Sequence, residues 1–133
     1  MHEPRYTPAL TALFARPALP LRGSIRVRRG DPARGAEVLW AADAVAGVWR
    51  NVGFRAWGCP HIIAVCHGLA ERLEGTTVEA APTALDGWLL HLGKELDIPA
   101  EKAVKILIIK DTLLELFASA GCDGPGAATT GSG

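Results

Sequence analysis

The chain has 133 residues, of which 49% are apolar, so it is long enough for one domain and can bury a core without disulfides or metal. Its 14 basic and 14 acidic residues give a net charge of zero. This balance argues against a general nucleic-acid-binding or membrane-surface role, because both need a large field of positive charge.

Nothing in the sequence predicts export or insertion into a membrane. No apolar run approaches the ~18 residues that a membrane span requires, and the amino-terminal residues lack the apolar stretch of a secretory signal. The three cysteines are an odd number, so a disulfide framework is not indicated. We therefore expect a cytoplasmic protein in a reducing compartment.

The first part of the chain predicts an extended arm followed by three strands. Residues 1–21 carry four prolines and are typical of one or two helical turns that lead into the arm. Residues 24–28 alternate apolar and basic side chains, as a half-buried strand does, and further strands are expected over 36–41 and 48–57. Three consecutive strands without an intervening helix favour an antiparallel meander.

The second part of the chain predicts helices. Pro60 suits a first helical position, and Ile62, Cys66 and Leu69 then recur at helical spacing. A capping pattern at 76–79 predicts a short helix, a third helix is expected from about 83 to 93, and a last one from 98 to about 119.

The last of these helices is apolar around most of its circumference. Lys105, Thr112 and Glu115 form its narrow polar face, so we expect it to be the most buried helix. The glycine-rich residues 121–133 predict a disordered tail. The prediction is one α+β domain over residues 1–120, in which a three-stranded antiparallel sheet packs against a C-terminal set of helices.

Cys59 is the first candidate for a functional residue, because it stands between the last strand and the first long helix. A thiol at a helix N-terminus lies at the positive end of the helix dipole, which favours the thiolate that binds metals and attacks sulfur. Gly58 leaves room for a bound group to approach. The competing interpretation is a small buried residue, the commoner role of a free cysteine.

Other potential ligands are less well placed. Cys66 falls on the apolar stripe of its helix, which favours a core role, whereas His61 is expected on another face and near Cys59. His67 lies too far along the helix to share a small site with Cys59. A zinc site on Cys59, His61 and Cys66 is only weakly indicated, because the spacing does not match the paired ligands of structural zinc sites.

The sequence contains no established catalytic motif. A nucleophile elbow, a P-loop, a dinucleotide fingerprint and a zinc-protease motif are all absent, so we do not predict an enzyme. Arginines are concentrated between positions 22 and 34, which indicates a solvated strand face or, alternatively, a docking surface for an acidic partner. These are Arg22, Arg26, Arg28, Arg29 and Arg34.

Residues 54–64, FRAWGCPHIIA, resemble the signature of the IscU/NifU-type iron–sulfur scaffold proteins, in which a strand ending in Gly-Cys leads into a helix of small and apolar residues. Residues 73–80 resemble the link that follows in this family, and residues 96–99 with Lys110-Asp111 resemble its closing helix. The resemblance covers roughly residues 6–117 in order. It implies the same strand-then-helix α+β fold.

The resemblance also implies where ligands would stand. The family builds a 2Fe–2S cluster, or binds zinc, on three cysteines and an aspartate, and only Cys59 matches one of these positions. Arg34 falls where the first cysteine stands, Ala36 where the aspartate stands, and Lys105 at or beside the third cysteine. A cationic pocket around a reactive thiol is therefore implied in place of a complete metal site.

Two classes of function follow from this resemblance. The first is a scaffold-like protein of iron–sulfur cluster assembly with a degenerate ligand site. It would accept sulfur on Cys59, or bind iron or a cluster with ligands from a partner or a homodimer mate. The second is an interaction module that kept the fold, lost metal binding, and docks to a cysteine desulfurase or a chaperone.

Overall fold

The computed structural model describes residues 7–17, 19–31, 33 and 35–122, with side chains as far as residue 120. In chain order its elements are α1 Pro8–Phe14, β1 Ile25–Asp31, β2 Ala36–Val45, β3 Val48–Trp57, α2 Pro60–Leu73, α3 Ala81–Glu95, the 3-10 turn η2 Ala100–Lys102 and α4 Ala103–Cys122. The predicted α+β class is confirmed. Arg34 and residues 123–133 of the predicted tail lie outside the described residues.

The three strands form an antiparallel sheet in the order β1-β2-β3. Val45 pairs with Val48 across a two-residue turn, in which Ala46 and Gly47 both have positive φ, as a tight hairpin requires. At the other end of this hairpin Glu37 pairs with Trp57. The pairing places the start of β2 beside the end of β3, where Cys59 follows.

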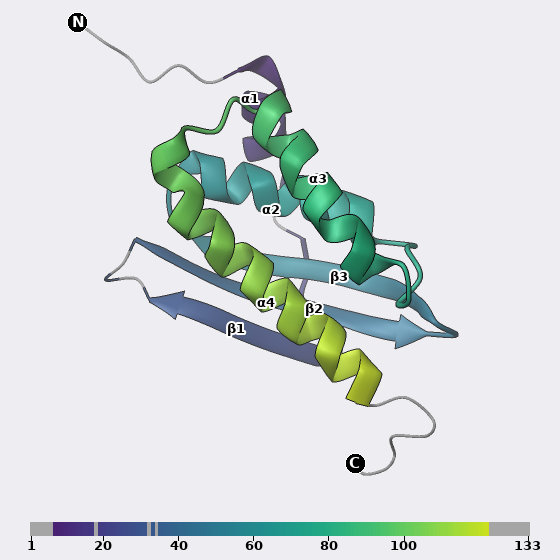
Figure 1. The fold of residues 1–133 in the computed structure, drawn as a ribbon. Coiled ribbons are helices and arrows are strands. Elements are labelled where there is room, and N and C mark those ends of the chain that lie inside the picture. The colour runs from purple at the N-terminus through teal and green to yellow at the C-terminus, as the bar shows by residue number, and fades with distance from the viewer. Residues whose placement is uncertain (1–6, 18, 32, 34, 123–133) are drawn as a thin grey trace, which may run out of the picture.

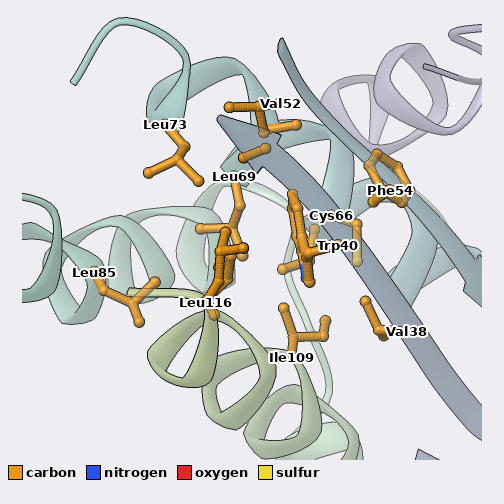
Figure 2. Packing of buried hydrophobic residues seen from close by; sticks show 14 of the residues in the cluster. Val38, Trp40, Val52, Phe54, Cys66, Leu69, Leu73, Leu85, Ile109 and Leu116 are labelled. Atoms are coloured by element: carbon orange, nitrogen blue, oxygen red, sulfur yellow. The ribbon is translucent and has the colours of Figure 1, made fainter. Parts of the chain in front are cut away.

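The helices cover one face of the sheet (Figure 1). α2 packs along β3, α4 crosses β1 and β2, and α1 and α3 pack against α2. Figure 2 shows the buried side chains between these layers, including Trp40 of β2 and Leu116 of α4. The ring centroids of Trp40 and Phe54 lie 5.3 Å apart.

The segment before β1 covers part of the opposite face of the sheet. Arg55 donates a hydrogen bond to the carbonyl oxygen of Leu19 at 2.6 Å, and Arg26 donates one to that of Leu21 at 2.9 Å. A Cβ added to Gly53 would overlap with the carbonyl oxygen of Pro20. The arm therefore lies directly on the sheet.

Other arginines of the basic segment pair with carboxylates of the chain. Arg28 contacts Glu37 at 2.6 Å, and Arg29 contacts Glu115 at 2.8 Å. The bond to Glu37 and its negative charge raise the pKa of Arg28. These pairings favour the solvated strand face over the docking surface for an acidic partner.

Two expectations about the helices are wrong. Residues 76–79 form no helix: Thr77 makes a β-bridge with Val48, and α3 begins at Ala81. α4 is not the most buried helix, because ten of the fourteen residues of α2 are buried while α4 exposes a whole face. Thr112, which was expected on the polar face, is fully buried, and its hydroxyl donates a hydrogen bond to the Ile108 carbonyl oxygen at 2.6 Å.

No helix in the described part of the chain is long and apolar enough to cross a membrane.

Candidate functional site

Cys59 is the N-cap residue of α2, between β3 and the helix. Its backbone is extended, with φ −77° and ψ 167°, and its carbonyl oxygen accepts hydrogen bonds from the amides of Ile62 and Ile63. Pro60 occupies the first helical position, as predicted. The Cys59 side chain makes no capping hydrogen bond, is half-buried, and packs against the hydrophobic core at the positive end of the α2 dipole.

Three segments that are distant in sequence meet at this end of the sheet. A Cβ added to Gly58 would lie 3.1 Å from the carbonyl oxygen of Gly35, and a Cβ added to Gly35 would lie 3.3 Å from Nζ of Lys105. Both glycines have positive φ, 157° for Gly58 and 84° for Gly35, where other residues are strained. The loop before β2 is therefore a neighbour both of the Gly58-Cys59 junction and of the first turn of α4.

The residues at the degenerate ligand positions fall on these segments. Ala36 is the buried first residue of β2, and Lys105 is a half-buried residue of α4. Neither a methyl group nor an ammonium can ligate iron or zinc. Arg34, the remaining degenerate position, is outside the described residues, so the cation that the structure brings to this region is Lys105.

His61 is buried near the loop that leads into η2. Burial lowers the pKa of this imidazole, and the positive charge of Lys102 lowers it further, while Asp97 and Glu101 act in the opposite direction. His61 is therefore neutral at pH 7. The charged residues around His61 belong to η2 and to the loop before it, whereas the charged residue beside Gly35 is Lys105 of α4.

Cys66 is completely buried in the core, as its place on the apolar stripe predicted (Figure 2). Burial raises the pKa of its thiol far above the usual range, so it stays protonated. Within the described residues, no group of three or more His, Cys, Asp or Glu side chains could hold a metal ion. Cys59, His61 and Cys66 thus form no common metal site, and the donors around Cys59 do not fit a cluster.

His67 belongs to a different region, as its distance along the helix predicted. Its ring stands edge-on to Phe54, with centroids 4.8 Å apart, and it lines a cavity of about 360 Å³ together with Arg16 and Glu71. Burial lowers the pKa of His67, and the nearby positive charge of Arg16 lowers it further. Arg16 and Glu71 form an ion pair at 2.6 Å.

Several features of this surface are not predicted by the sequence reasoning. A second cavity, of about 390 Å³, lies between α3, η2 and α4 and is lined by Leu89, Ile98 and Ile106. Trp57, two residues before Cys59, is about half exposed. The apolar outer face of α4 has a signal in the sequence, because Val104, Leu107, Leu114 and Ala118 recur at steps of three, seven and four residues, which place them on one side of a helix.

Comparison with known proteins adds no family. Neither a protein-family model nor a curated protein matches the sequence. The resemblance to the IscU/NifU-type scaffolds therefore depends on the motifs of residues 54–64, 73–80 and 96–111 alone.

Proposed function

We propose that this chain is a scaffold-like protein associated with iron–sulfur cluster assembly, and that Cys59 accepts sulfur from a cysteine desulfurase or another assembly protein. The observation that carries the proposal is the meeting of the Gly35 loop, the Gly58-Cys59 junction and Lys105. These are the segments on which the resemblance places ligand positions. Their convergence supports the alignment behind the resemblance.

The proposed chemistry is the transfer of one sulfur atom. The Cys59 thiolate attacks the outer sulfur of a persulfide on the donor cysteine. A new sulfur–sulfur bond forms at Cys59, the donor's sulfur–sulfur bond breaks, and the donor cysteine leaves as a thiolate. No net oxidation occurs, because the same sulfane sulfur changes carrier.

The surroundings of Cys59 favour this reaction over cluster binding. Cys59 stands at the positive end of the α2 dipole, and the Gly35 loop, which lies against Gly58, brings the ammonium group of Lys105 to this region. A cluster requires four ligands, and of the four positions that the resemblance implies only Cys59 carries a ligand residue. Iron or a cluster held here would need the other ligands from a partner or a second copy.

The test is an anaerobic sulfur-transfer assay. We expect reduced protein, incubated with a cysteine desulfurase and cysteine, to gain the mass of one sulfur atom on Cys59, measured by mass spectrometry of the intact chain and of its peptides. Cys59→Ser abolishes the gain, whereas Cys122→Ser, a matched control at the end of α4, retains it. We expect Lys105→Met to slow the transfer, because it removes the positive charge beside the Gly35 loop.

The same samples are then supplied with ferrous iron and sulfide and their visible absorption is recorded. Charge-transfer bands that depend on Cys59 would mean that a second copy supplies the missing ligands. A chain that gains neither sulfur nor iron, and in which Cys59→Ser changes nothing, would refute the proposal.

A second candidate function is an interaction module without sulfur chemistry. The exposed apolar residues of α4 favour it: Val104 is 70% exposed, Leu107 53% and Leu114 39%. In that case partner binding depends on α4 and is unaffected by Cys59→Ser.

A further inference from the structure

α4 carries two apolar faces, and the chain covers only one of them. The inner face packs on the sheet through residues such as Ile109, Leu113 and Leu116, all fully buried. The outer face carries Val104, Leu107, Asp111, Leu114 and Ala118. Together with Ala100 of η2, which continues this face, they form what we call the outer stripe, and all of them are exposed. A helix that is apolar on both faces normally has a neighbour on each.

The outer stripe has the spacing of a helix–helix contact. Its members follow one another at steps of four, three, four, three and four residues, which is the heptad pattern that places knobs against a second helix. From Val104 to Ala118 the stripe extends over roughly 21 Å of helix, at about 1.5 Å per residue. This length suits four turns of a partner helix.

A cavity adjoins the stripe at its amino-terminal end. The cavity of about 390 Å³ is lined by Leu89 and Gly93 of α3 and by Ile106 of α4, and two members of the stripe, Ala100 and Leu107, also line it. Large apolar side chains of a docked helix are usually anchored in such a depression. The surface therefore combines a ridge of apolar residues with a pocket for one anchor.

The charge at the centre of the stripe selects the occupant. The Asp111 carboxylate makes no hydrogen bond or ion pair with the described part of the chain, and Lys110 beside it forms an ion pair with Asp86 at 2.9 Å. A second copy docked by a two-fold axis at the middle of the stripe, parallel or antiparallel, would place Asp111 against its own counterpart. Like charges brought together in this way are strongly unfavourable, whereas a Lys or Arg at that level would pair with Asp111.

We propose that the outer stripe and the adjoining cavity are the docking site for an amphipathic helix of another protein, whose apolar face carries a Lys or Arg opposite Asp111. The proposal does not depend on sulfur chemistry at Cys59. It assigns α4 two roles, since the inner face holds the sheet and the outer face receives the partner.

The probes are two synthetic helical peptides of equal length with leucine at every a and d position except the central a position. One peptide has Lys there and the other has Glu. Each is used at a concentration at which sedimentation shows it to be monomeric. Calorimetry measures the affinity for the full chain, and amide NMR shifts report the binding face.

We expect the Lys peptide to bind roughly tenfold or more tightly than the Glu peptide, because opposite charges meet at the centre of an apolar contact. Asp111→Lys reverses this preference. Leu107→Glu abolishes binding while circular dichroism and thermal unfolding stay unchanged, because Leu107 is exposed. Cys59→Ser binds as the wild type does, which separates this proposal from the proposed function.

Three outcomes would overturn the proposal. Equal affinity for the two peptides would mean non-specific apolar adhesion, and binding to neither would mean that the stripe is no helix-docking site. A dimer of the chain alone that Leu107→Glu dissociates would assign the stripe to a second copy.

Discussion

α2 and α4 lie on the same face of the sheet, and both are rich in apolar residues, yet they differ in how much of their surface the chain covers. α2 lies between β3, α1 and α3, and ten of its fourteen residues are buried. α4 faces β1 and β2 on one side and exposes Val104, Leu107 and Leu114 on the other. Apolar composition therefore indicates which faces of a helix can be buried. Which of these faces are buried in the fold depends on how many elements pack against the helix.

Among the tests of this contrast, the largest change in the free energy of unfolding is expected when one leucine in each helix is truncated to alanine. Leu69→Ala, in α2, removes a fully buried side chain and should lower the free energy of unfolding by about 2–5 kcal/mol. Leu107→Ala, the matched variant on the outer face of α4, should change it by less than about 0.5 kcal/mol. Urea unfolding followed by tryptophan fluorescence measures both. Equal losses would mean that the outer stripe is already covered in solution.

The parts of the fold that were predictable depend on local patterns. β3 has the predicted bounds of 48–57 because a tight turn precedes it and Gly58 ends it, and α2 begins at Pro60 because proline suits a first helical position. The capping pattern at 76–79 predicted a short helix, and this prediction was wrong because Thr76 and Thr77 pair with β3. The amide of Trp49 donates a hydrogen bond to the Thr76 carbonyl oxygen at 2.9 Å, and Thr77 forms a β-bridge with Val48. Tertiary pairing there outweighs local preference.

The candidate site was predictable only in part for a similar reason. The position of Cys59 at the strand–helix junction follows from local sequence. The proximity of Gly35 to Lys105 joins segments 70 positions apart and has no local signal, so only the family resemblance pointed to it. The burial of His61 and the α3–α4 cavity depend on how η2 packs, which spacing along one helix does not reveal.

The pH dependence of stability also tests how completely α2 is enclosed, and its expected effect is smaller than that of Leu69→Ala. Burial lowers the pKa of both α2 histidines, His61 and His67, from the ordinary value of 6.5, so below that pH the unfolded chain binds more protons than the folded one. Stability is therefore full above pH 6.5 and decreases as the pH falls through the lower folded pKa values. For His67 the negative charge of Glu71 opposes this lowering of the pKa.

Unfolding free energies measured between roughly pH 5 and pH 8 check this slope, the range in which histidines titrate. The double variant His61→Gln with His67→Gln should flatten the acid side of the profile. An acid slope that persists in the double variant would assign the sensitivity to other groups.

The smallest expected effect concerns the ion pair that joins α4 to the edge of the sheet. Arg29 of β1 and Glu115 of α4 meet at 2.8 Å, but their side chains are 53% and 45% exposed, so water and salt screen the attraction. Glu115→Gln should therefore lower the free energy of unfolding by no more than about 1 kcal/mol, and less at high salt. A double-mutant cycle with Arg29→Gln isolates the coupling between the two charges. A coupling that matches the loss from Leu69→Ala would mean that α4 is held to the sheet by charge, whereas the buried leucines of its inner face indicate that it is held by apolar packing.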